Sequence, residues 1–154
     1  HFYFGEYIRL LEIAEAHKAL KQKRIINFLR VFFVGMSSLR LARDTSQKQW
    51  REFGEQAVEI FVPLVRFSKH NFETKLFLLQ AELHYLNGNI SEAKVAYEKS
   101  IESSRKYKFK NDEAVAHELY GIFLIENKMF DRGMTLLDTS LSKYREWGAE
   151  LKVK

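Results

Sequence analysis

The sequence predicts an all-α fold, a tetratricopeptide-like superhelical array of antiparallel helix pairs, and three observations lead to this prediction. The 154 residues include one proline, Pro63, and only seven glycines, too few turn-forming residues for an all-β fold. Hydrophobic residues make up 46% of the chain and recur at helical spacing. Small side chains recur at a nearly fixed interval, as they do in helical-repeat proteins.

The repeat is best seen in the segment "NGNISEAKVAYEKSI" (87–101). Gly88 is expected to end one helix, and Ala93 is small enough to let the next helix pack closely. The equivalent positions are 10, 54, 93 and 133, so the spacings are 44, 39 and 40 residues, longer than the ordinary tetratricopeptide unit. In the partner helices, Ala81 and Gly121 are the small residues expected where two helix backbones cross.

Seven helices are expected along the chain. They cover about residues 6–20, 24–44, 47–68, 72–87, 90–107, 111–127 and 129–147. Turns are expected at 44–47, 69–71, 87–89 and 109–112. Ser91 and Asn111, each followed by an acidic residue, are expected to cap helix starts. The chain is expected to be a single domain spanning 1–154 and, since it opens without a methionine, a fragment of a longer protein.

The aromatic-rich stretch 26–42 leaves two interpretations open. Its large apolar residues recur at helical spacing, which is typical of a helix buried inside the array. The alternative is that it lines a partner groove, because helical-repeat arrays bind ligands on the side formed by their first helices.

Charge and cysteine content exclude several classes of function. The net charge of +5 is interspersed along the predicted helices and accompanies no nucleic-acid-binding motif, so no nucleic-acid partner is expected. The chain has no cysteine, which fits the cytoplasm or another reducing intracellular compartment. The longest apolar run, 28–36, contains Arg30 and is too short to cross a bilayer, so no transmembrane segment is expected.

The dipeptide His117–Glu118 forms half of a zinc-protease motif. That motif needs a second histidine four residues after the first, and here the position holds Gly121. We therefore expect His117 and Glu118 to lie on a helix surface, Glu113 to lie on a solvated face as well, and His84 to pack between helices. No phosphate-binding glycine loop and no nucleophile elbow occur in the sequence, so no enzyme activity, cofactor or metal is expected.

Four segments, 4–16, 35–54, 77–125 and 142–154, resemble in this order the helical-repeat region of large multi-domain signalling kinases. In those proteins a Ser/Thr-kinase-like domain and a STAND-type (AAA-like) ATPase precede the repeats, and a GAF domain and a sensor histidine kinase often follow. The most distinctive matches are Asp112–Glu118 and Tyr144–Val153. Lys128 departs from the family, which usually has glycine there. The family's kinase and ATPase motifs have no counterpart in the 154 residues.

The resemblance implies a non-enzymatic protein–protein interaction and regulatory arm, whose partner is a protein, a peptide or a neighbouring domain of the same chain. The alternative is a structural scaffold or spacer in a larger assembly. Counting back from the small residues of the first helices gives the positions expected to face a partner, beside other apolar ones such as Leu78 and Ile122. The candidate partner-binding residues are Phe32, Met36, Arg40, Lys75, Glu82, Tyr85 and Glu118. Neighbouring helices of a longer parent protein could instead cover these residues as ordinary core.

Overall fold

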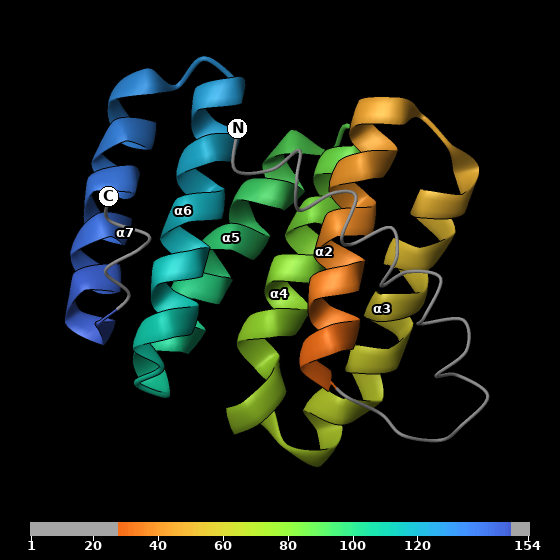
Figure 1. Cartoon of the computed structure of the whole chain (residues 1–154), viewed down its shortest axis with the longest axis horizontal. Coiled ribbons are helices and arrows are strands. Elements are labelled where there is room, and N and C mark those ends of the chain that lie inside the picture. The colour runs from red at the N-terminus through yellow and green to blue at the C-terminus, as the bar shows by residue number, and fades with distance from the viewer. Residues whose placement is uncertain (1–27, 149–154) are drawn as a thin grey trace.

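The computed structural model describes residues 28–148, and this part of the chain forms six helices without any strand (Figure 1). They are α2 (Phe28–Thr45), α3 (Lys48–Phe67), α4 (Lys69–Leu86), α5 (Ile90–Lys106), α6 (Lys110–Glu126) and α7 (Phe130–Trp147). The predicted all-α fold is confirmed. The helix expected over 6–20 lies outside the described residues.

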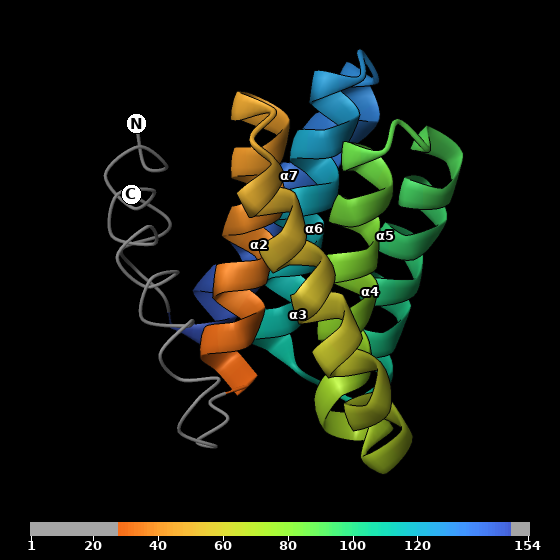
Figure 2. The same ribbon diagram turned by 90° about the vertical axis from the view of Figure 1, so that its right-hand side faces the viewer.

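The helices are arranged as three successive antiparallel pairs, α2–α3, α4–α5 and α6–α7 (Figures 1 and 2). Helix α4 contacts both α2 and α6, so the first helices of the three pairs form one row. The second helices α3 and α5 each also touch the first helix of the following pair. This stacking of pair on pair is consistent with a helical-repeat arrangement.

A turn of constant form sets the period of the array. Gly88, Lys108, Lys128 and Gly148 have φ values of 77°, 59°, 64° and 84°, and they follow one another at intervals of 20 residues. After each of the first three, the next backbone N–H donates to the carbonyl five residues back, at 2.8 to 3.0 Å. This is the Schellman motif, which satisfies carbonyl groups at a helix end. One helix with its turn therefore takes 20 residues, and two such units explain the 40-residue spacing of small residues.

Two predicted turns and two predicted caps are wrong. Residues 69–71 belong to α4, and only Ser68 separates α3 from α4. The turn expected at 109–112 lies at 107–109 instead. Ser91 and Asn111 lie inside the first turns of α5 and α6, where they cap nothing. Polar residues are tolerated in a first helical turn because its N–H groups have no intrahelical partner, so polarity alone did not locate the helix starts.

Small residues at the helix crossings behave as the repeat pattern predicts. Ala81 and Ala93 are fully buried, and Gly35 lies against Ala57 and Leu79 without room for a side chain. A single apolar cluster runs from α2 to α6 through these crossings. Burial of each large apolar side chain in such a cluster contributes about 1.5–3 kcal/mol. The row of first helices is therefore held in place by a continuous core beneath it.

Candidate partner-binding face

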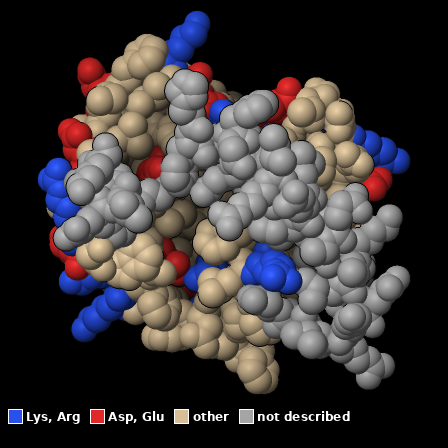
Figure 3. Space-filling view, in the orientation of Figure 1, with Lys and Arg blue, Asp and Glu red and all other residues tan. Residues whose placement is uncertain are grey.

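The predicted partner-binding residues come from the row of first helices, α2, α4 and α6. Four of the predicted side chains reach across to a neighbouring first helix, namely Arg40, Lys75, Glu82 and Tyr85. Lys, Arg, Asp and Glu side chains lie among one another on the visible described surface (Figure 3). The chemistry of this face is that of a network of ion pairs and hydrogen bonds, and three groups of residues make it up.

The first group joins all three first helices near their C-terminal ends. The Arg40 guanidinium donates to Glu126 at 2.8 Å and to Asp44 at 3.2 Å. The Tyr85 hydroxyl donates to the other oxygen of Glu126 at 2.8 Å. Burial pushes the pKa of the Glu126 carboxyl upward, but the hydrogen bonds from Tyr85 and Arg40 and the nearby arginine charges outweigh it and hold that pKa below its usual value. Glu126 is therefore a carboxylate at neutral pH.

The second group is buried. The Arg43 guanidinium donates to Glu82 at 2.7 Å, and the Tyr97 hydroxyl donates to the other oxygen of the same carboxylate. The Arg43 guanidinium also lies 4.0 Å from the centre of the Tyr85 ring. Burial, reinforced by the negative Glu82, raises the pKa of the Tyr97 phenol well above its usual value, so this hydroxyl remains a donor. The Glu82 carboxylate is therefore buried in the interior and cannot contact a partner in this conformation.

The third group fixes the other end of the face. The Lys75 ammonium donates to Asp112 at 2.8 Å, which links α4 to the start of α6. The same ammonium lies 5.9 Å from the centre of the Phe32 ring. Both side chains of the ion pair are largely buried, at 14% and 11% exposure. Lys75 therefore holds two first helices together.

The remaining candidates divide between the core and another contact. Phe32 is buried in the main apolar cluster, and Met36 packs against that cluster while half-buried. Glu118 accepts a hydrogen bond from the Tyr144 hydroxyl at 2.5 Å, so it faces α7 rather than the neighbouring first helix. The structure brings Arg40 and Tyr85 together at one end of the row, places Lys75 in a separate contact and directs Glu118 elsewhere.

Sequence reasoning missed the residues that complete these contacts. Arg43, Asp112 and Glu126 were not among the candidates, although each pairs with one of them. The partners are separated by 39, 37 and 86 residues along the chain. The available signal was opposite charge on neighbouring first helices, and that signal selects a pair only once the helices have been placed side by side.

His117 does not lie on a helix surface, and the prediction that it does is wrong. It is 1% exposed, enclosed between α5, α6 and α7. Its Nδ1 lies 2.8 Å from the Glu113 carbonyl oxygen and its Nε2 lies 3.4 Å from the Arg105 guanidinium. A carbonyl only accepts and a guanidinium only donates, so Nδ1 carries the proton and Nε2 accepts. Both ring nitrogens are occupied, which leaves no lone pair for a metal.

Glu113 also departs from its prediction. It is buried rather than solvated, and its carboxylate accepts from Arg105 at 3.0 Å and lies 3.7 Å from the Lys143 ammonium. Within residues 28–148, no three histidine, aspartate or glutamate side chains are grouped so that they could hold a metal ion.

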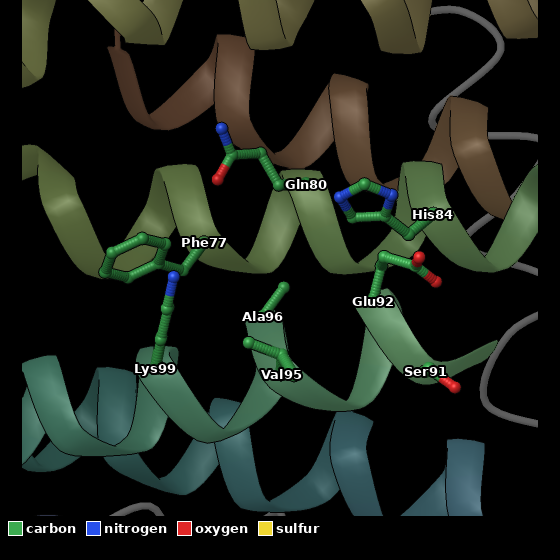
Figure 4. A pocket seen from close by; sticks show the side chains of 8 residues that line it. All are labelled: Phe77, Gln80, His84, Ser91, Glu92, Val95, Ala96 and Lys99. Carbon is green, nitrogen blue, oxygen red and sulfur yellow. The ribbon is translucent and has the colours of Figure 1, made fainter. Parts of the chain in front are cut away.

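A hollow of about 400 Å³ lies between α4 and α5 (Figure 4). His84, predicted to pack between helices, lines this hollow and is partly exposed. At the other end, the Lys99 ammonium lies 5.9 Å from the centre of the Phe77 ring. The lining mixes apolar and polar side chains and presents no converging set of charged groups.

Comparison with known proteins found no matching family model, no similar curated protein and no similar solved structure. In the part of the chain that the structure describes, no helix has the length and apolar character needed to cross a membrane.

Proposed function

We propose that this chain is a non-enzymatic protein-interaction and regulatory arm whose partner docks on the row of first helices. The observation that supports this most directly is the Arg40–Glu126–Tyr85 cluster, since its three side chains come from α2, α6 and α4. The side chains of Arg40 and Glu126 are 36% and 32% exposed. The cluster is thus both a link between three helix pairs and a polar group within reach of a partner.

An acidic side chain of a partner could replace Glu126 as the acceptor for Arg40. Such an exchange has a small net cost, because Arg40 keeps a carboxylate partner and exposed ion pairs are worth only about 0–1 kcal/mol. It would at the same time release the link between α2 and α6. Partner binding would then favour a different packing of the helix pairs, which is the property a regulatory arm requires.

The resemblance to the repeat region of STAND-type signalling kinases supports the same proposal. In STAND-type proteins a repeat arm can hold the ATPase inactive until a partner or signal arrives. On this proposal the partner is a protein, a peptide or a neighbouring domain of the same chain, and the compartment is the cytoplasm or another reducing one.

A structural spacer is the second candidate function, and a specific observation favours it. Lys75 and Glu82 direct their charged groups at neighbouring helices in largely buried pairs. A spacer needs such internal contacts and nothing on its surface. The two candidates differ in what should happen when the exposed cluster is altered.

The test uses two substitutions with opposite expected effects. Arg40→Gln removes the cation that would meet an acidic partner, while Glu126→Gln removes the carboxylate that competes for it. The probe is a fluorescein-labelled amphipathic helical peptide rich in Glu and Leu, and its anisotropy is followed at low ionic strength, where charge pairs are least screened. We expect Arg40→Gln to weaken binding and Glu126→Gln to strengthen it.

The matched control is Arg51→Gln, since Arg51 lies on the second helix α3 and is 39% exposed. It should bind the peptide as the unaltered chain does. Equal affinities for the Arg40 and Glu126 variants, with only their melting temperatures changed, would favour the spacer.

A further inference from the structure

Helix α7 carries an apolar stripe. Its residues are Phe130, Met134, Leu137 and Leu141, at spacings of four, three and four residues, which place them on one side of the helix. Phe130 and Met134 are 57% and 52% exposed, Leu141 is exposed as well, and Leu137 is half-buried. Contiguous exposed apolar patches are uncommon on monomeric soluble proteins, and large ones mark interaction sites.

The corresponding residues of the equivalent helix α5 are buried or half-buried. Moving back by 40 residues gives Ile90, Lys94, Tyr97 and Ile101. Tyr97 and Ile101 are buried, and Tyr97 packs against helix α6. The Tyr97 ring stacks on Tyr120 with centroids 5.3 Å apart and contacts Phe123 at 5.2 Å. At this boundary, the next first helix therefore packs on the stripe of the preceding second helix.

The surface of α6 can be compared with that of the equivalent helix α4 in the same way. In α4, Lys75 and Tyr85 reach across to Asp112 and Glu126 of α6. Forty residues later, the positions of Lys75 and Tyr85 are occupied by Val115 and Ile125. Val115 and Ile125 are half-buried, Val115 against the main apolar cluster and Ile125 beside Gly133 of α7, so α6 carries apolar side chains where α4 carries polar ones. A repeat that ends an array in water normally has a polar outer face, whereas Phe130, Met134 and Leu141 of α7 are exposed apolar side chains.

We propose that the face made by the α7 stripe together with Val115 and Ile125, called the end face below, docks the first helix of a further helix pair. That pair would stack on α6–α7 as α6–α7 stacks on α4–α5. This surface lies mainly on the second helix α7 and includes none of the residues of the Arg40–Glu126–Tyr85 cluster, so the inference goes beyond the proposed function.

The internal boundary defines the chemistry of the occupant. It is an amphipathic helix that runs antiparallel to α7, as α6 does to α5. It brings aromatic side chains to Leu137, as Tyr120 and Phe123 are brought to Tyr97. Its opposite side is polar or meets a second helix of its own.

The backbone at the end of α7 fits this continuation. Gly148 has a φ of 84°, at the position where Lys108 has a φ of 59°. Lys108 leads through a single residue, Phe109, into α6. The turn conformation that precedes a first helix elsewhere in the array is therefore already present at Gly148.

The experiment extends the full chain by inserting a second copy of residues 109–148 directly after Gly148, which keeps the 20-residue period. The native sequence has no cysteine, so Met134→Cys in the original α7 supplies a single thiol on the stripe. We expect the extension to slow alkylation of this thiol at least about tenfold, since a covered site reacts only after local opening. The melting temperature should also rise, because each stacked interface adds to the stability of a repeat array.

The decisive control repeats the extension in a chain whose original α7 carries Phe130→Ser and Leu141→Ser. Both the thiol protection and the rise in melting temperature should disappear. Val95→Ser, which alters a 49% exposed residue on α5 away from the end face, should preserve both.

Two results would overturn the proposal. The first is an extended chain whose thiol reacts as fast as in the unextended one, with the melting temperature unchanged. The second is a dimer in sedimentation of the unextended Met134→Cys chain with its thiol already protected, since a second copy would then be the occupant.

Discussion

Gly121 of α6 and Gly133 of α7 face each other where the two helices cross, and neither has room for a side chain. A Cβ atom added to Gly121 would lie 3.0 Å from the Gly133 carbonyl oxygen, and one added to Gly133 would lie 2.9 Å from the Gly121 carbonyl oxygen. Contacts of this length against backbone atoms can be relieved only if the helices move apart. The pair of glycines therefore sets the distance between α6 and α7.

Gly121→Leu should destabilise the array by about 1–3 kcal/mol, the usual cost of overpacking. Chemical denaturation followed by circular dichroism measures this change. The matched control is Ser142→Leu, at an exposed position of α7, which should alter stability far less. Equal stabilities for the two variants would contradict the close crossing.

Lys128→Gly should stabilise the chain by about 0.5–1 kcal/mol. Lys128 adopts a φ of 64°, where a residue with a Cβ is strained and glycine is not. Part of the gain is offset because glycine makes the unfolded chain more flexible. The converse control is Gly88→Ala, at the equivalent turn with a φ of 77°, which should destabilise. A melting temperature that falls for Lys128→Gly would show that the turn is not strained.

Arg43→Met should be strongly destabilising, by about 3–5 kcal/mol, because it leaves the buried Glu82 carboxylate without its cation. Adding Glu82→Gln should recover part of this loss, since the amide removes the unpaired charge and can still accept from Tyr97. A double-mutant cycle measured by chemical denaturation isolates the coupling between the two residues. Arg51→Met, whose ion pair is exposed, should cost about 0–1 kcal/mol. A loss for Arg43→Met as small as that of Arg51→Met would mean the buried pair is not formed.

His117 should make stability fall as the pH drops below 6.5. Burial lowers the pKa of its imidazole from 6.5, and the Arg105 and Lys143 charges act in the same direction against the opposing contacts of Glu113. Below pH 6.5 the unfolded chain then binds a proton that the folded chain does not, so the free energy of unfolding decreases until the pH passes the lowered pKa. Urea denaturation at a series of pH values measures this slope.

His117→Gln should flatten the slope below pH 6.5. If the His117 variant keeps the full slope, the pH dependence belongs to other groups.

The candidate site was less predictable than the fold. Lys75 and Tyr85 follow from their positions in the repeat and Arg40 from its place beside Met36 and Leu39, and the contacts of all three do cross between first helices. Their positions in the repeat could not show that Asp112 already accepts from Lys75, or that Glu126 already accepts from Arg40 and Tyr85. A position in a repeat gives the direction of a side chain, whereas its partner depends on how the next pair is placed.

The helical fold, the 40-residue period and the small residues at the crossings could be predicted from the chain alone. These follow from local properties, since helical spacing of apolar residues and the size of Ala81, Ala93 and Gly121 are visible in the chain itself. The burial of His117 and Glu113 and the links among α2, α4 and α6 could not be predicted in this way. Those depend on charges brought together from segments up to 86 residues apart, and only the stacking of the helix pairs supplies that proximity.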